Sequence, residues 1–147
     1  MSSVPFHYID LRAFCYATEE PERVRETLDT LMPTDGQDPP SVERQENDGF
    51  HGDRILVLSS RMERADAMRY ALARLAEAAE FETLLDQVEE RVDSNCAFYV
   101  QLDKQAAFDG RIRLGEGISV RAKVEAYPAK RATAIENART TLLELRG

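Results

Sequence analysis

Hydrophobic and polar residues alternate along three segments of this chain, which is the pattern of β-strands that bury one face. The segments are residues 6–16, 96–103 and 118–126. Residues 54–62 form a fourth, more apolar segment, which favours a strand in the middle of a sheet. Residues 41–47 contain Val42 as their single aliphatic residue, as an exposed edge strand does, and residues 49–53 are typical of a hairpin turn. We therefore predict a sheet of about five strands.

Apolar residues recur at helical spacing in three further segments. The first runs from Thr18, a suitable N-cap, to Met32, and Pro33 follows it. The second covers residues 63–92, with a bend near residues 78–80, and the third covers residues 129–146. A short helical turn is predicted at residues 105–108. The order β-α-β-β-α-β-β-α predicts one α+β domain over residues 1–147, with a single-layer mixed or antiparallel sheet and helices packed on one face.

The composition excludes several classes of protein. A hydrophobic content of 43% in 147 residues is that of a globular chain with a core. No apolar run approaches the roughly 20 residues that cross a bilayer, and the first residues lack the regions of a signal peptide, so we expect a cytoplasmic protein without membrane contact. Cys15 and Cys96 fall on apolar positions and are predicted to be buried free thiols. Because the sequence has no C-x-x-C pair and no paired histidines, we expect no metal and no cofactor.

Charge is distributed unevenly along the chain. The formal net charge is −8, yet residues 104–131 carry seven basic and three acidic residues. All three lysines lie in this stretch, which we call the basic segment. A polyanion is attracted by local charge, so the basic segment is the first candidate for a binding site. Over the whole chain, Asp and Glu are abundant and Lys is scarce. This composition favours a halophilic protein over an ordinary acidic protein from a GC-rich genome.

Recognisable catalytic motifs are missing from the sequence. It contains no G-x-x-x-x-G-K-[ST] phosphate loop, no G-x-G-x-x-G dinucleotide loop and no G-x-S-x-G nucleophile elbow. We interpret His7 and His51 as structural, because neither belongs to a recognisable acid–base arrangement. Asp10 and Asp103 are a candidate carboxylate pair if their strands are neighbours. We expect no enzymatic activity.

The basic segment offers two kinds of contact with a nucleic acid. Alternation places Arg121, Lys123 and Tyr127 in one row on the last strand, and guanidinium and phenol groups stack on unpaired bases. Two further basic residues begin the last helix, where free backbone N–H groups favour phosphate. On charge alone, three alternatives stay open: the basic side chains contact nucleic acid, bind another anion, or pair with acidic residues of the same molecule.

Four stretches of the sequence resemble an archaeal family of small RNA-binding proteins whose members are described as predicted exosome subunits. The stretches are FHYIDLRAFCYATEEPERV, GFHGDRILVLSSRM, FYVQLDKQAAFDGRIRL and VRAKVEAYPAKR, and the similarity extends from about Phe6 to Leu145. Its most specific pieces are D-K-Q at residues 103–105 and K-V-E-A-Y-P at residues 123–128. The acidic, lysine-poor chain looks like a haloarchaeal member. The resemblance implies RNA binding without catalysis, and a fold similar to that of the large-subunit ribosomal protein that binds 5S ribosomal RNA.

We therefore predict a noncatalytic RNA-binding protein, an accessory factor in RNA processing or exosome-linked degradation. Its expected partners are RNA and, as a further candidate, exosome subunits, and its state is either a monomer or a homodimer. The predicted RNA contacts are Lys104, Gln105, Arg111, Arg113, Arg121, Lys123, Tyr127, Lys130 and Arg131. Two alternatives remain. One is an interaction module that docks an acidic partner through the basic strand, and the other is a small enzyme that acts on a phosphorylated metabolite.

Overall fold

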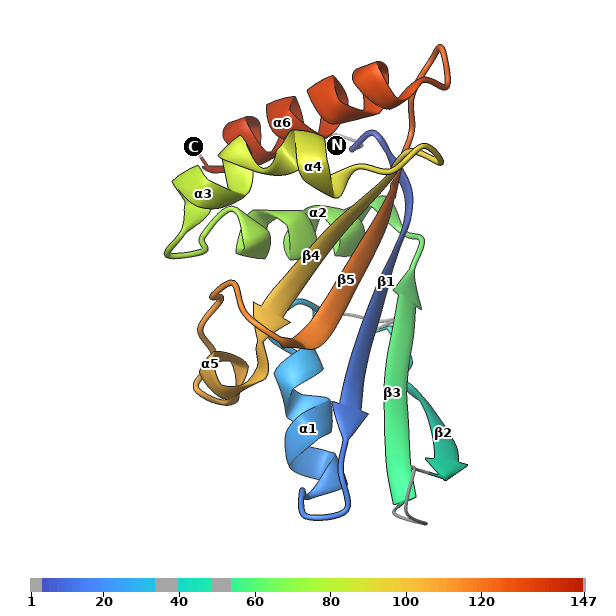
Figure 1. Ribbon diagram of the computed structural model, residues 1–147, viewed down its shortest axis with the longest axis vertical. Coiled ribbons are helices and arrows are strands. Elements are labelled where there is room, and N and C mark those ends of the chain that lie inside the picture. The colour runs from blue at the N-terminus through green and yellow to red at the C-terminus, as the bar shows by residue number, and fades with distance from the viewer. Residues whose placement is uncertain (1–3, 34–39, 49–53, 147) are drawn as a thin grey trace.

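The computed structural model describes residues 4–33, 40–48 and 54–146. In these residues the protein is built around one five-stranded sheet (Figure 1). The strands are β1 (Phe6–Cys15), β2 (Glu43–Asp48), β3 (Arg54–Met62), β4 (Ala97–Asp103) and β5 (Gly117–Val124). They are ordered β2-β3-β1-β5-β4, and all neighbouring strands are antiparallel. The predicted α+β class with a single-layer sheet is confirmed, and the sheet is antiparallel rather than mixed.

The helices lie on one side of this sheet (Figure 1). They are α1 (Pro21–Leu28), α2 (Ala65–Leu75), α3 (Phe81–Asp86), α4 (Val88–Arg91), α5 (Lys104–Phe108) and α6 (Arg131–Arg146). The helices α2, α3, α4 and α6 stack over one end of the strands, and α1 with α5 covers the other end. No helix of the described residues lies on the opposite face of the sheet, which we call the open face.

Alternation along the strands explains why the sheet has one buried and one open face. Ile9, Leu11 and Ala13 of β1 are completely buried, and Ile118 and Ala122 of β5 are buried beside them. These residues pack with the apolar faces of the helices in one hydrophobic core. The residues between them point to the open face, because successive side chains of a strand alternate. The sequence pattern therefore assigns each strand residue to the core or to the open face.

The first helix is shorter than the sequence predicts. It begins at Pro21, with Glu20 rather than Thr18 at the N-cap position, and it ends at Leu28 rather than Met32. The hydroxyls of Thr27 and Thr30 donate to the carbonyls of Val24 and Thr27, at 2.6 and 2.7 Å. Such local side-chain hydrogen bonds compete with a regular helix, which explains why the chain after Leu28 continues in tighter turns.

The predicted long helix over residues 63–92 is divided into α2, α3 and α4. The break after α2 falls at residues 76–80, where the sequence predicts a bend, whereas the second break, at Gln87, was not predicted. The last helix begins at Arg131, two residues later than expected. The predicted hairpin turn at residues 49–53, which includes His51, lies outside the described residues.

Both cysteines are buried free thiols, as predicted. Within the described ranges, no group of three or more His, Cys, Asp or Glu residues is arranged to hold a metal ion. No helix in this part of the chain has the length and apolarity needed to cross a membrane.

Candidate nucleic-acid interface

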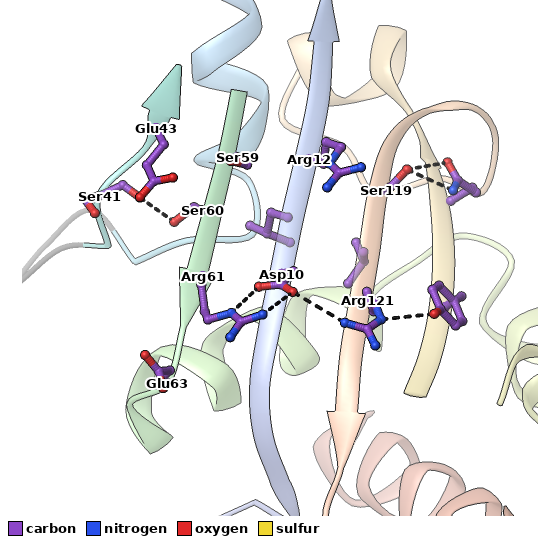
Figure 2. Close-up of a pocket in the computed structure, with 14 residues that line it drawn as sticks. Asp10, Arg12, Ser41, Glu43, Ser59, Ser60, Arg61, Glu63, Ser119 and Arg121 are labelled. Carbon is purple, nitrogen blue, oxygen red and sulfur yellow. Dashed lines mark hydrogen bonds and ion pairs between the residues drawn. The ribbon is translucent and has the colours of Figure 1, made fainter. Parts of the chain in front are cut away.

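Side chains on the open face form rows across the strands at every second register position, and in β1 these rows contain Tyr8, Asp10, Arg12 and Phe14. The second row joins β3, β1, β5 and β4 through Arg61, Asp10, Arg121 and Tyr99, which are neighbours in the strand register. Figure 2 shows Arg61, Asp10 and Arg121 in line across three strands. The row is therefore a product of strand order, because its members lie far apart in the sequence.

Asp10 holds the two arginines of this row in place. Arg61 donates two hydrogen bonds to its carboxylate, with Nε–Oδ1 at 2.7 Å and Nη2–Oδ2 at 3.0 Å. Arg121 forms a longer ion pair with Asp10, with Nη1–Oδ2 at 3.9 Å. A bidentate arginine–carboxylate pair fixes the plane of the guanidinium, so the Arg61 side chain is held in one orientation on the open face.

Two tyrosines orient Arg121. Its Nε donates to the Tyr99 hydroxyl at 3.0 Å, and its Nη1 donates to the Tyr8 hydroxyl at 3.0 Å. The hydrogen bond with Tyr99 is the main cause that raises the pKa of Arg121 above its ordinary value, so the group stays charged. The guanidinium of Arg61 lies over the Tyr8 ring, 4.0 Å from its centroid. Arg61 thus already stacks on Tyr8, whereas Tyr99 is 39% exposed and the Arg121 guanidinium lies 5.9 Å from its ring centroid.

The next row contains the least restrained cation of the face. Arg12 of β1 lies between Ser59 of β3 and Ser119 of β5, and Gln101 of β4 follows Ser119. The Gln101 amide and the Ser119 hydroxyl bond each other, at 2.9 and 3.2 Å. Arg12 is exposed, and within the described part of the chain no hydrogen bond or ion pair engages its guanidinium. It is therefore free to bind an anion or to stack on a ring.

These two rows line a hollow of about 700 Å³ on the open face (Figure 2). Its lining contains three arginines and three carboxylates, namely Arg12, Arg61, Arg121, Asp10, Glu43 and Glu63. Serine hydroxyls and the Gln101 amide supply further hydrogen-bonding groups. The hollow is thus polar and close to neutral, with its positive charge concentrated on planar guanidinium groups.

A second, smaller hollow of about 280 Å³ lies beyond the end of β5. Lys123, His7 and Tyr127 line it, together with Asn95. Lys123 is the next outward residue after Arg121 on β5, and its ammonium donates to the backbone carbonyl of Asn95. The two hollows therefore follow one another along β5, with Arg121 in the first and Lys123 in the second.

Lys104, one of the predicted contacts, is turned into the protein. It is 8% exposed, and its ammonium donates to the Glu19 carboxylate at 2.8 Å and to the Phe14 carbonyl at 2.9 Å. Partial burial opposes the charge of Glu19, but the bonds from Lys104 and from the Tyr16 N–H outweigh it and lower the pKa of Glu19. A side chain on Gly117 would lie 2.6 Å from Cβ of Lys104, so the glycine makes room for the inward lysine.

The other predicted residues are spread over several places. Arg111 and Arg113 lie in the connection between α5 and β5, where they pair with Asp109 and Glu80 at 3.5 and 3.7 Å. Arg131 donates to the carbonyls of Val92 and Glu89, at the end of α4. Gln105 on α5, Tyr127 and Lys130 are exposed. The structure thus brings Arg121, Lys123 and Tyr127 together along one path, and it does not gather all nine residues on one surface.

Sequence reasoning based on the basic segment missed the residues that strand pairing brings beside Arg121. Tyr8 and Arg12 come from β1, Arg61 comes from β3, and Tyr99 comes from β4. Alternation alone already placed most of them on the outward faces of their strands. The missing signal was the strand order, which sets β1 between β3 and β5. The same order separates Asp10 from Asp103, because β5 lies between β1 and β4, so the predicted carboxylate pair was wrong.

Comparisons with known proteins agree with this architecture. Residues 8–124 match the model of a family described as RNA binding. The chain is 36% identical over 144 residues to RNA-binding protein PAB1135 of Pyrococcus abyssi, and the match covers 92% of this chain and 93% of the relative.

Two solved structures of DUF54 proteins are also similar. One, from Methanothermobacter thermautotrophicus, is 37% identical with a TM-score of 0.78, and the match covers 93% of this chain and 98% of the other. One from Archaeglobus fulgidus is 25% identical with a TM-score of 0.79, and the match covers 92% and 99%. The family match spans all five strands of the sheet except the first residues of β1. The chain belongs to this family, whose model is described as RNA binding.

Proposed function

We propose that this protein binds RNA through the open face of its sheet, without a catalytic step. The observation that carries the proposal is a sheet face that no helix of the described residues covers. On this face Arg121 bonds two tyrosine hydroxyls, and Arg12 lies between Ser59 and Ser119. Sheet faces with exposed aromatic and guanidinium groups are a recurrent platform for RNA. Membership of the family and the name of the Pyrococcus abyssi relative support the same choice.

In this proposal the path of RNA follows β5. Arg12 and Arg121 contact phosphate or stack on bases in the larger hollow, and Lys123 with Tyr127 continues the contact in the smaller one. Lys130, which is exposed just beyond Tyr127, engages a further phosphate. Arg111, Arg113 and Gln105 become contacts where the RNA crosses the β4 edge of the sheet. Lys104 and Arg131 are left out of the contact surface, because Lys104 is buried and neither residue lines the two hollows.

The alternative of an enzyme acting on a phosphorylated metabolite finds little support in the hollow. Asp10, one of the carboxylates that line the hollow, forms a bidentate pair with Arg61, which is the arrangement of a structural ion pair. The alternative of docking an acidic partner through the basic segment is weakened as well. The basic side chains of that segment are dispersed, and several already pair within the molecule.

Replacing Arg121 tests the assignment of the open face. We expect Arg121→Gln to weaken RNA binding about tenfold, which corresponds to about 1.4 kcal/mol, because the neutral amide cannot replace a charged guanidinium in contact with phosphate. Fluorescence anisotropy with a labelled random-sequence RNA pool measures the affinity. Arg139→Gln on α6 is the matched control, because it removes the same charge from the helical side. Equal affinities of Arg121→Gln and wild type would place the RNA elsewhere.

The finer part of the proposal is an accessory role in RNA processing or exosome-linked degradation in a halophilic archaeon. The sequence resemblance and the acidic, lysine-poor composition support it. Co-purification of exosome subunits from nuclease-treated extract tests the association, since RNA-mediated contacts are removed there. If no exosome subunit co-purifies after nuclease treatment, the association depends on RNA bound to both partners and not on a direct protein contact.

A further inference from the structure

Two exposed aromatic rings are held on the open face. Tyr99 is 39% exposed on β4, and Phe14 is 36% exposed on β1, one row beyond Arg12. The Tyr99 ring is also fixed, because its hydroxyl accepts the hydrogen bond from Arg121. A ring that is already oriented loses little freedom when a base stacks on it.

Groups that can recognise the edge of a base lie next to Tyr99. Gln101 and Ser119 occupy neighbouring positions on β4 and β5, one register row from Tyr99 and Arg121. Both side chains are on the solvent side of the sheet, and in the free protein they bond each other. An amide and a hydroxyl together offer donors and acceptors to the edge of a base that is not paired with another base.

The charge of the hollow argues against a duplex as its ligand. Three carboxylates offset three arginines in its lining. Double-stranded RNA presents its phosphates and 2′-hydroxyls on the outside, so a protein that binds it needs a surface with a net positive charge. A single strand also offers base faces and base edges, which a protein can bind by stacking and hydrogen bonds in addition to contacts with phosphate.

We infer that the open face recognises unpaired bases of single-stranded RNA, with one base stacked on Tyr99 and its edge facing Gln101 and Ser119. This inference rests on the proposed function and specifies the structural class of RNA that the site accepts. Arg12 is paired with Ser119 across β1 and β5, and Arg121 lies two residues along β5. Both contact the phosphates or neighbouring bases of the same strand.

The strandedness of the ligand is tested with the full-length wild-type protein. The probe is a fluorescein-labelled RNA pool of about 12 nucleotides, within the range bound by single-strand platforms, either alone or annealed to its complement. We expect the single strands to bind at least tenfold more tightly than the duplex. Equal binding, or tighter binding of the duplex, overturns the inference and leaves RNA binding intact. Binding of neither probe overturns the proposed function itself, so the two failures are distinguishable.

Two substitutions at Tyr99 test the stacking contact. We expect Tyr99→Leu to weaken single-strand binding about tenfold, within the range measured for loss of one stacked base, whereas Tyr99→Phe, which keeps the ring, retains most of the affinity. Tyr70→Leu on α2 is the matched control, because Tyr70 is 41% exposed on the helical side. Thermal unfolding of each variant verifies that the fold is intact. Equal losses in Tyr99→Leu and Tyr70→Leu, or no loss in either, would refute stacking on Tyr99.

Discussion

Arg12→Glu is expected to weaken RNA binding roughly 100-fold, while the free energy of unfolding stays within about 0.5 kcal/mol of wild type. The large effect on binding has two causes. The substitution removes an exposed guanidinium from the middle of the hollow, and it adds a fourth carboxylate to a lining that already contains three. The small effect on stability follows because no hydrogen bond or ion pair within the described residues depends on Arg12. Anisotropy titration and urea unfolding measure the two quantities.

The control for Arg12→Glu is Arg139→Glu, which makes the same change of charge on α6. If general electrostatic attraction dominates binding, the two variants lose similar affinity, because both shift the net charge equally. If the open face is the site, the loss is confined to Arg12→Glu. An unaltered affinity in Arg12→Glu would contradict the proposed position of the RNA.

Lys104→Met is expected to lower the free energy of unfolding by about 3 kcal/mol, because removal of one partner leaves the other charge of a mostly buried ion pair unmatched. The variant also loses the hydrogen bond from the ammonium to the Phe14 carbonyl and the contact with the Tyr16 ring, whose centroid lies 5.1 Å from Nζ. Urea unfolding at neutral pH measures the loss. RNA affinity is expected to change less than twofold, because Lys104 does not line either hollow.

The pH dependence distinguishes the ion pair from simple packing. The pKa of Glu19 is lowered in the folded protein, so its pair with Lys104 contributes stability above the unfolded pKa and loses it as the pH falls through the folded value. The difference between wild type and Lys104→Met should therefore narrow below about pH 4. Adding Glu19→Gln to Lys104→Met should recover part of the stability at neutral pH. A strong loss of RNA binding in a folded Lys104→Met protein would instead restore Lys104 as a contact.

The strands and their faces could be predicted from the sequence because a period of two is a local property. The alternation in residues 6–16 and 118–126 identified core residues, such as Ile9 and Val120, and the outward residues between them. Helix ends were harder to predict. Thr27 and Thr30 turn their hydroxyls to nearby carbonyls, and nothing in the apolar period of the first helix reveals that competition.

The candidate site could be predicted only in part, because it depends on which strands become neighbours. The charge count identified Arg121 and Lys123 within one segment. Arg12 reaches the site through the pairing of β1 with β5, a long-range contact that no local pattern records. The sequence also did not reveal that the Lys104 side chain points into the protein, since this depends on its ion pair with Glu19 in a distant loop. Charge clustered along the sequence is therefore a weaker guide than charge clustered on a sheet face.

Photo-crosslinking tests the central claim most directly, namely that RNA lies on the open face of the sheet. The protein is irradiated with single-stranded RNA containing 4-thiouridine, and the attached peptides are identified by mass spectrometry. We predict crosslinks in β1, β4 and β5, at or beside Phe14, Tyr99 and Arg121, and a loss of these crosslinks in Arg12→Glu. Crosslinks that concentrate on α2 or α6, around Tyr70 or Arg139, would contradict the account.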